Sequence, residues 1–272
     1  VEIQKETGAT FLHPFNDKYV IAGQGTIGLE ILEQLDGKVD TILCPIGGGG
    51  IIAGIAVAAK GINPNIKIVG VQTANIPSMQ ESMKNGEVTT AFKSTTIADG
   101  IAVKTPGDVT FEIINELVDE VVVVEEDEIA QGMLFLMENQ KVVAEGAGAV
   151  TTAALLSGKY VPKKDENVVC VISGGNVDVN TLYRVIGTAL TKEARRYSFN
   201  TVIQDKPGGL AELTKIISEY DANILSANLS RSSMGGALGS LTAEMVLETF
   251  NHDHIDKLKV AITEAGFEIV EI

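Results

Sequence analysis

Hydrophobic residues in the first two thirds of the chain alternate between short continuous runs and helical periodicities. Runs such as IKIVGV (66–71) and VVCVI (168–172) are almost wholly apolar, which is typical of strands buried on both faces of a parallel sheet. Between the runs, apolar residues recur at helical spacing. The alternation predicts an α/β fold with a parallel sheet covered by helices, with strands at 39–44, 66–71, 120–124 and 167–172 and helices at 23–35, 50–60, 106–117, 126–140, 148–157 and 178–192.

Beyond Arg196 the pattern changes to that of a smaller second unit. The segments follow one another as βαββαβ, the order of a ferredoxin-like unit. The short charged stretch KEARR (192–196) separates the two patterns. We therefore predict one domain over residues 1–193 and a second over residues 197–272, the second with strands at 197–205, 223–232, 240–250 and 267–272 and helices at 207–220 and 254–266.

Four consecutive glycines, Gly47, Gly48, Gly49 and Gly50, join the first predicted strand to the helix that follows it. Each glycine costs roughly 0.5–1 kcal/mol of folding free energy relative to alanine, so the run serves either backbone conformation or close approach. Bare backbone N–H groups beside a helix N-terminus are suited to a phosphate group. A phosphate cradle is the favoured interpretation, and a tight strand-to-helix turn is the alternative.

Two further features could contribute to a ligand site. The loop Ser173-Gly174-Gly175-Asn176 follows the strand 167–172 directly, so it is expected at the same edge as the glycine run. Glu145, in KVVAEGAGA, is flanked by small residues between two helical patterns. Its carboxylate either caps a helix or tunes protonation beside a bound ligand, and the sequence leaves both interpretations open.

Composition narrows the functional classes. The formal net charge of −15 disfavours nucleic acid as a partner, so an anion site has to be made from neutral backbone donors. No apolar run is long enough to cross a membrane and no signal peptide pattern is present, which makes the cytoplasm the default location. The three His and two Cys residues are not spaced as metal ligands. We predict that Cys44 and Cys170 are buried thiols.

Six short motifs occur together in one order: HPFND (13–17), GQGTIGLEI (23–31), PIGGGGIIAG (45–54), TIADG (96–100), AEGAGAV (144–150) and SGGNVD (173–178). With them the chain resembles the threonine dehydratases (threonine ammonia-lyases), which are pyridoxal-phosphate enzymes of the tryptophan-synthase-β-like fold (fold type II). In the second unit, DKPGGL (205–210) and DANI (221–224) resemble an ACT domain, an amino-acid-sensing module.

The resemblance implies roles for individual residues. Gly47 to Gly50 would hold the phosphate of the pyridoxal-phosphate cofactor, and Ser173 would bond the pyridine nitrogen. A neutral hydroxyl at that position weakens the ring as an electron sink and favours β-elimination. Glu145 would lie close to the ring and the substrate as the catalytic candidate, and Asn16 would line the same cleft. The implied reaction converts L-threonine or L-serine to a 2-oxo acid and ammonia.

The chain departs from the family pattern in two places. Relatives that bind a divalent cation carry Glu and Asp where this chain has Gln72 and Ser78, so we expect no metal site of that type. The family's Schiff-base lysine lies in a Ser-Phe-Lys-x-Arg-Gly type of segment, and this sequence has none. Because the chain also opens with Val1, we expect it to be a piece of a longer protein and inactive by itself.

For the second unit the resemblance implies binding of a branched-chain amino acid at an interface between two copies, by Asp205, Gly208, Gly209, Leu210 and Asn223. Feedback control of the enzyme by such an amino acid would suit a role in isoleucine biosynthesis. A site between two copies implies a homo-oligomer. A purely dimerising unit is the alternative. For the whole protein, a related serine dehydratase or racemase stays open, because selectivity for one methyl group is worth only roughly 1–3 kcal/mol. A non-catalytic amino-acid sensor that has lost the lysine also stays open.

Overall fold

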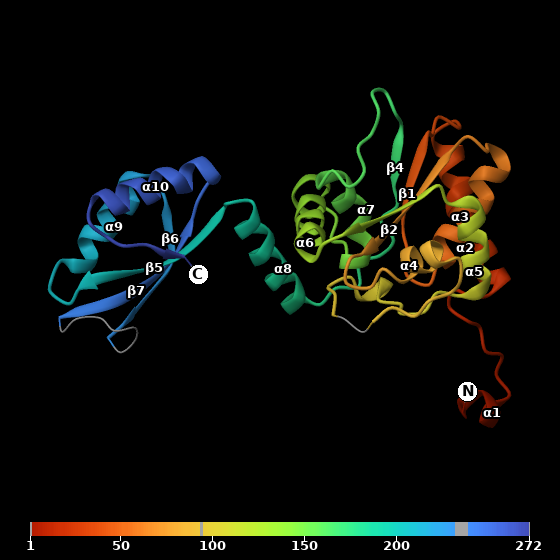
Figure 1. Cartoon of the computed structure of the whole chain (residues 1–272), viewed down its shortest axis with the longest axis horizontal. Helices are drawn as coiled ribbons and strands as arrows, with labels where there is room; N and C mark the ends of the chain where they lie inside the picture. Colours follow the sequence, from red (N-terminus) through yellow and green to blue (C-terminus); the bar gives the residue numbers. More distant parts are fainter. Residues whose placement is uncertain (1, 93–94, 232–238, 272) are drawn as a thin grey trace. The chain divides into compact units, whose positions relative to one another are not determined.

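The computed structural model of the chain describes residues 2–92, 95–231 and 239–271. It contains two compact units, Val1–Ile186 and Gly187–Ile272, which are drawn in Figure 1. The division falls within helix α8 (Val179–Lys192), upstream of the charged KEARR stretch. Each unit has its own hydrophobic core, so each is described by itself.

The first unit is built on a parallel four-stranded sheet in the order β3-β2-β1-β4. The central strand β1 is buried along its whole length, and Leu43 in it lies beside Val69 and Cys170 in the two neighbouring strands. This burial explains why the strands read as continuous apolar runs. Each strand overlaps its predicted position: β1 (Thr41–Pro45), β2 (Lys67–Thr73), β3 (Glu120–Val124) and β4 (Val168–Cys170).

Helices cover both faces of this sheet, so the predicted α/β class is confirmed. Helices α2, α3 and α5 lie on one face, and α6 and α7 lie on the other (Figure 1). The core beneath the first group is built from Ile, Leu, Val and Ala side chains. The helical elements are α1 (Glu2–Thr7), α2 (Lys18–Gln34), α3 (Gly50–Ile62), α4 (Ser78–Asn85), the 3-10 turn η1 (Asp99–Ile101), α5 (Asp108–Leu117), α6 (Glu126–Phe135), the π-helical turn η2 (Leu136–Gln140) and α7 (Gly146–Leu156), followed by α8.

Two helices differ from the prediction for local reasons. Helix α2 begins at Lys18 rather than at 23, because the Asp17 side chain accepts hydrogen bonds from the N–H groups of Tyr19 and Val20 and caps the helix. Helix α4 was missed because its sequence, SMQESMKN, is mostly polar and too short for a periodic signal.

Helices α2 and α3 cross at unusually short range. A Cβ atom built on Gly54 would lie 2.3 Å from the carbonyl oxygen of Ile21 and 2.6 Å from the backbone nitrogen of Gly25. Glycine at this crossing lets the two backbones touch. Since α3 starts at Gly50, the crossing also fixes the helix that follows the glycine run.

The second unit follows the predicted βαββαβ order. Its antiparallel sheet has the strand order β6-β7-β5-β8, and α9 and α10 lie on one face of it (Figure 1). The core between helices and sheet includes Phe199, Leu213 and Leu258, which are fully buried. The elements are β5 (Arg196–Gln204), α9 (Gly209–Glu219), β6 (Asn223–Ser230), β7 (Ser240–Glu248), α10 (His252–Glu264) and β8 (Val270–Glu271).

Candidate functional site

The glycine run forms a loop between β1 and α3 in which side chains are excluded. Gly49 has a φ of +98°, and a Cβ atom there would lie 2.7 Å from Cδ1 of Ile114 and 2.9 Å from Cβ of Thr110. At Gly47, a Cβ atom would lie 3.0 Å from Cα of Ile101. Glycine is therefore needed at Gly49 for both conformation and space, and at Gly47 for space.

The loop is held by its neighbours and leaves backbone donors free. The Thr110 hydroxyl donates to the carbonyl oxygen of Gly48 at 2.6 Å, and the ring of Phe15 packs flat against Gly48, where a Cβ atom would lie 2.3 Å from Cγ. The first N–H that donates into the helical ladder of α3 is that of Ala53, to Gly49. The N–H groups of the preceding turn thus remain available to an anion.

A cavity of about 320 Å³ collects all but one of the residues predicted for the cofactor and catalytic site, the exception being Asn16. Its walls come from the ends of β1 and β4, the starts of α3 and α7, and the segments around residues 15 and 100. This placement at the carboxyl ends of parallel strands is the expected ligand position for an open α/β sheet. The cavity is lined by Gly47, Gly48, Gly49, Gly50, Glu145 and Ser173, together with Pro14, Phe15, Gln24, Pro45, Ile51, Gly100, Ile101, Val103 and Ala147.

Glu145 lies between two glycines inside this cavity. A Cβ atom on Gly174 would be 2.4 Å from Oε1 of Glu145, and one on Gly100 would be 3.3 Å from the same oxygen. The backbone N–H of Glu145 donates to the carbonyl oxygen of Gly174 at 3.0 Å, which joins the two loops. Glu145 occupies the N-cap position of α7, yet its side chain makes no capping hydrogen bond. Its carboxylate faces the cavity instead.

Asn16 lies beside the cavity rather than in its lining. Its side chain donates to Oδ1 of Asp108 at 2.5 Å and accepts from the N–H of Val109 at 3.1 Å, so it caps the start of α5. The bond from Asn16 lowers the pKa of Asp108. The absence of a side chain at Gly107 makes room for this contact.

Phe15 takes the lining position on this side of the cavity. Sequence reasoning missed Phe15, Gly100 and Ile101 as lining residues. Their only signal in the sequence was membership of the motifs HPFND and TIADG, or adjacency to them.

Gln72 and Ser78, where cation-binding relatives carry acids, have structural contacts here. Both are fully buried. Gln72 accepts from the N–H of Gln80 at 2.9 Å, and the hydroxyl of Ser78 donates to the carbonyl oxygen of Val103 at 2.7 Å. Across residues 2–92, 95–231 and 239–271, no group of three His, Cys, Asp or Glu side chains is placed to hold a metal ion.

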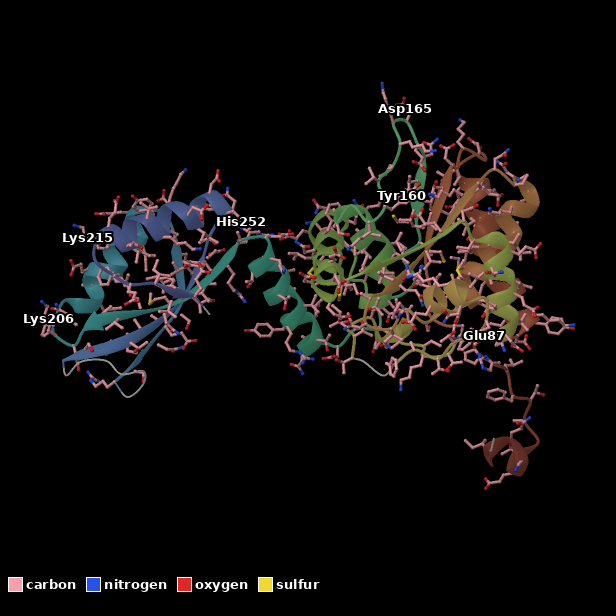
Figure 2. All side chains as sticks on the ribbon, viewed as in Figure 1. Glu87, Tyr160, Asp165, Lys206, Lys215 and His252 are labelled. Atoms are coloured by element: carbon pink, nitrogen blue, oxygen red, sulfur yellow. The ribbon has the colours of Figure 1, made fainter. Side chains whose placement is uncertain are left out.

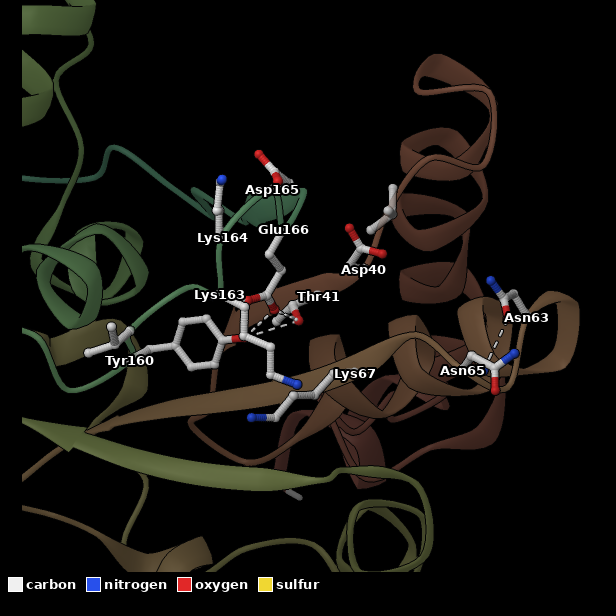
Figure 3. Close-up of a pocket in the computed structure, with 12 residues that line it drawn as sticks. Asp40, Thr41, Asn63, Asn65, Lys67, Tyr160, Lys163, Lys164, Asp165 and Glu166 are labelled. Carbon is white, nitrogen blue, oxygen red and sulfur yellow. Dashed lines mark hydrogen bonds between the residues drawn. The ribbon is translucent and has the colours of Figure 1, made fainter.

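A second cavity, of about 410 Å³, lies at the opposite edge of the sheet, where β1 and β2 begin (Figure 3). Tyr160 and Asp165, in the loop between α7 and β4, mark its position in Figure 2. Glu166 is the centre of a hydrogen-bonded cluster here, since it accepts from the hydroxyls of Thr41 and Tyr160, each at 2.5 Å, and from the N–H of Lys163 at 2.6 Å. These bonds, led by that from Thr41, lower the pKa of Glu166 to about 2.

The charges around this second cavity do not select a ligand. Three lysines line it, and so do three carboxylates, so the lining has no net charge. Two of the carboxylates, Asp40 and Glu166, accept backbone hydrogen bonds. We therefore interpret the cluster as a structural feature that holds the loop between α7 and β4 against the sheet. The charged residues that line the cavity are Asp40, Lys67, Lys163, Lys164, Asp165 and Glu166.

In the second unit, the residues named as effector candidates fall in two places. Gly208, with a φ of +94°, and Gly209 form the start of α9, and Leu210 packs against the core. Asp205 lies beside them and is bound by Arg231, whose Nε and Nη2 donate at 2.8 and 3.1 Å; these bonds lower the pKa of Asp205.

Asn223 lies at the other end of the sheet, where it donates to Glu248. Strand β6 runs from Asn223 to Ser230 and ends near Arg231. Its length, at ~3.3 Å per residue, separates Asn223 from the Asp205 end by about 23 Å. Within one copy of the unit these residues therefore do not share a ligand.

Fold and site together define an α/β protein with a cavity suited to an anionic group at the carboxyl edge of a parallel sheet. A family model described as pyridoxal-phosphate dependent enzyme matches residues 1–174. The chain belongs to this family of pyridoxal-phosphate dependent enzymes.

Several named proteins and solved structures are similar to the chain. An L-threonine ammonia-lyase of Thermotoga maritima is 48% identical over 269 residues, which is 99% of this chain and 66% of that relative. The chain thus spans slightly less than two thirds of the relative's length. Among solved structures, threonine deaminase isoform 2 of Solanum lycopersicum has a TM-score of 0.64 at 36% identity, covering 69% of this chain and 55% of that one. Maize serine racemase has a TM-score of 0.63 at 39% identity, covering 71% and 59%.

The cavity fits the family's cofactor. Its glycine loop has no side chains, the backbone N–H groups of this loop lie at the N-terminus of α3, and the Ser173 hydroxyl lies beyond the end of β4, which suits a phosphorylated pyridine ring. No helix in the described ranges combines the length and the hydropathy needed to cross a bilayer.

Proposed function

We propose that this chain is part of a pyridoxal-phosphate dependent threonine ammonia-lyase, which converts L-threonine to 2-oxobutanoate and ammonia and L-serine to pyruvate and ammonia. The observation that carries the proposal is the 48% identity to the Thermotoga maritima L-threonine ammonia-lyase across 99% of the chain. The cavity supports it, because the glycine loop, Ser173 and Glu145 meet at one end of the sheet.

The glycine loop and Ser173 have different roles in this proposed function. Gly47 to Gly50 offer backbone N–H groups to the cofactor phosphate, and the N-terminus of α3 adds its positive end. Ser173 offers a neutral hydroxyl to the ring nitrogen. When bound, the cofactor supplies an electron-withdrawing ring that makes the α-proton of an amino acid acidic enough to remove.

Glu145 is the proposed catalytic side chain of this chain. Its carboxylate is the one charged group among the described lining residues, and glycines on both sides leave it open to a ligand. A carboxylate in that position attracts the ammonium group of an amino-acid substrate and can accept a proton from it. The lysine that forms the Schiff base would come from a part of the protein outside this sequence.

The test uses the protein encoded by the complete reading frame that contains this sequence. Saturated with pyridoxal phosphate, it should release 2-oxobutanoate from L-threonine, with a higher kcat/KM for threonine than for serine. The 272-residue chain alone should release none. Absence of 2-oxobutanoate from the complete protein would refute the substrate assignment.

Racemisation of serine is the second candidate, because the maize serine racemase is 39% identical over the matched part. A chiral assay of serine incubated with the same protein separates the two reactions. Formation of D-serine faster than pyruvate would favour the racemase.

For the second unit we propose an ACT domain that binds a branched-chain amino acid between two copies of the protein. The separation of Asn223 from Asp205 within one copy supports an interface site, since a second copy can bring the two ends together. The glycines at the start of α9 offer free N–H groups to the ligand carboxylate.

This proposal implies a homo-oligomer, and we place the protein in the cytoplasm. Calorimetry with isoleucine, valine and leucine tests the effector. Sedimentation with and without the ligand tests the assembly. A dimer that gives no heat of binding with any of the three amino acids would favour a unit that only dimerises.

A further inference from the structure

The wall of the cofactor cavity that faces the glycine loop is a short segment, residues 95–101, which ends in the 3-10 turn η1. Its last residues, Gly100 and Ile101, line the cavity. A Cβ atom on Gly100 would lie 3.0 Å from Cβ of Ala147, and one on Gly47 would lie 3.0 Å from Cα of Ile101. The segment is thus wedged between the glycine loop and the start of α7, and a displacement of a few tenths of an ångström would reach both.

One carboxylate outside the cavity fixes this segment. Oε2 of Glu126 accepts from the N–H of Ile97 at 2.7 Å, and Oε1 accepts from the hydroxyl of Thr73 at 3.0 Å. Thr73 is the last residue of β2 and is 1% exposed. Glu126 is the first residue of α6, where the helix dipole stabilises its negative charge. The carboxylate therefore ties the segment to the sheet and to α6 at once.

Neighbouring hydroxyls and an amide complete the network. Thr96 donates to the hydroxyl oxygen of Thr73 at 3.2 Å and accepts from the N–H of Ala98 at 3.1 Å. Asn75 donates to the carbonyl oxygen of Thr95 at 2.6 Å. Among the described members of this network, Glu126 is the charged one, and a charged acceptor makes the stronger bonds.

From this geometry we propose that Glu126 is a positioning residue for the cofactor site. It holds segment 95–101 so that Gly100 and Ile101 stand at the correct distance from the glycine loop and Glu145. The inference rests on the proposed cofactor cavity, and it adds a residue that touches neither cofactor nor substrate.

The experiment compares four variants of the protein encoded by the complete reading frame, without cofactor, by amide NMR and hydrogen exchange. Glu126→Ala removes both bonds. Glu126→Gln keeps both contacts: its oxygen can accept from Ile97, and its NH₂ can donate to Thr73, whose hydroxyl then donates to Thr96 instead of accepting from it. Thr73→Val removes the anchor hydroxyl with little change of volume. Glu125→Ala is the matched control, because Glu125 caps the same helix in a capping box with Glu128 and is absent from the segment's network.

In Glu126→Ala, exchange at Ile97 should become about tenfold faster, as expected for the loss of one hydrogen bond. The signals of Gly47, Gly100 and Ile101 should shift with it. Glu126→Gln should restore the wild-type pattern, and Glu125→Ala should leave these signals unchanged. If Glu126→Ala does not fold, Thr73→Val carries the same comparison.

Shifts confined to Thr73 and Ile97, or equal shifts in Glu125→Ala, would overturn the proposal. A second measurement is the dissociation constant for pyridoxal phosphate, which should be about tenfold higher in Glu126→Ala than in Glu126→Gln. If neither the wild-type protein of the complete reading frame nor any variant of it binds pyridoxal phosphate, the assignment of the cavity fails, while the NMR comparison still decides the role of Glu126.

Discussion

The crossing of α2 and α3 gives the sharpest test of the packing around the site. We predict that Gly54→Ala destabilises the first unit, whereas Gly61→Ala, in the same helix, stabilises it. At Gly54 the new Cβ atom would be 2.3 Å from the carbonyl oxygen of Ile21, about 1 Å closer than ordinary contact. At Gly61 the new atom meets nothing within 4 Å. The two substitutions differ in their surroundings and not in their chemistry.

The magnitudes follow from opposing contributions. Alanine in place of a helical glycine gains roughly 0.5–1 kcal/mol from the unfolded chain and from helix propensity. At Gly54 this gain is outweighed, because the atoms in the way belong to the backbone of α2. Overpacking of this kind costs typically about 1–3 kcal/mol, and more where a helix must shift. We expect a net loss of about 2 kcal/mol in the free energy of unfolding for Gly54→Ala and a gain of about 0.5 kcal/mol for Gly61→Ala.

Urea unfolding followed by circular dichroism measures the difference, and hydrogen exchange in α3 assigns it to the first unit. For a unit of this size the expected losses correspond to about 4–8 °C in Tm for Gly54→Ala. Wild-type stability in Gly54→Ala would refute the close contact. Equal losses in both variants would show that α3 tolerates no alanine for a reason other than the crossing.

Three further outcomes are expected. Thr201→Val should raise the stability of the second unit by about 1 kcal/mol in thermal unfolding, because the Thr201 hydroxyl is buried without a partner among the described residues; a loss would reveal a partner. The pKa of Glu166 in the folded protein is lowered to about 2, so the ionised carboxylate stabilises the fold fully above pH ~4.5, and this stabilisation is lost as the pH falls toward 2. After allowance for solvent screening, the contribution is on the order of 1 kcal/mol. Glu166→Gln should therefore flatten the curve of unfolding free energy against pH between pH ~4.5 and ~2. Gly48→Ala should weaken pyridoxal-phosphate binding at least tenfold in a fluorescence titration, because its Cβ would strike the Phe15 ring.

The parallel sheet could be predicted from the sequence because strands buried on both faces are continuous apolar runs. Strands β1 to β4 are apolar runs in the sequence, and the pattern alone places the loops after β1 and β4 at one edge of the sheet. Parallel strands carry their carboxyl ends to the same edge, and because β1 and β4 are neighbours in the sheet, Gly47 to Gly50 and Ser173 meet there. The tertiary position of these residues follows from topology alone.

Side-chain direction could not be predicted in the same way. Asn16 and Phe15 are adjacent in HPFND, yet Phe15 lines the cavity and Asn16 caps α5. The partner that decides this, Val109, is 93 residues away in sequence. In the second unit, DKPGGL and DANI lie close in sequence, but the strand register puts Asp205 and Asn223 at opposite ends of the sheet. Such outcomes depend on long-range pairing, which a single sequence does not encode locally.

The distribution of charge explains how an acidic chain can hold an anionic cofactor. With a net charge of −15, a phosphate approaching the protein meets repulsion on average, and no lysine or arginine lines the cavity among the described residues. The attraction is instead short-range, from N–H groups and the dipole of α3, which act within about one turn of the helix. Glu145, kept bare by Gly100 and Gly174, then leaves a negative charge beside the site. A ligand that brings its own positive charge, as the ammonium group of an amino acid does, matches both features at once.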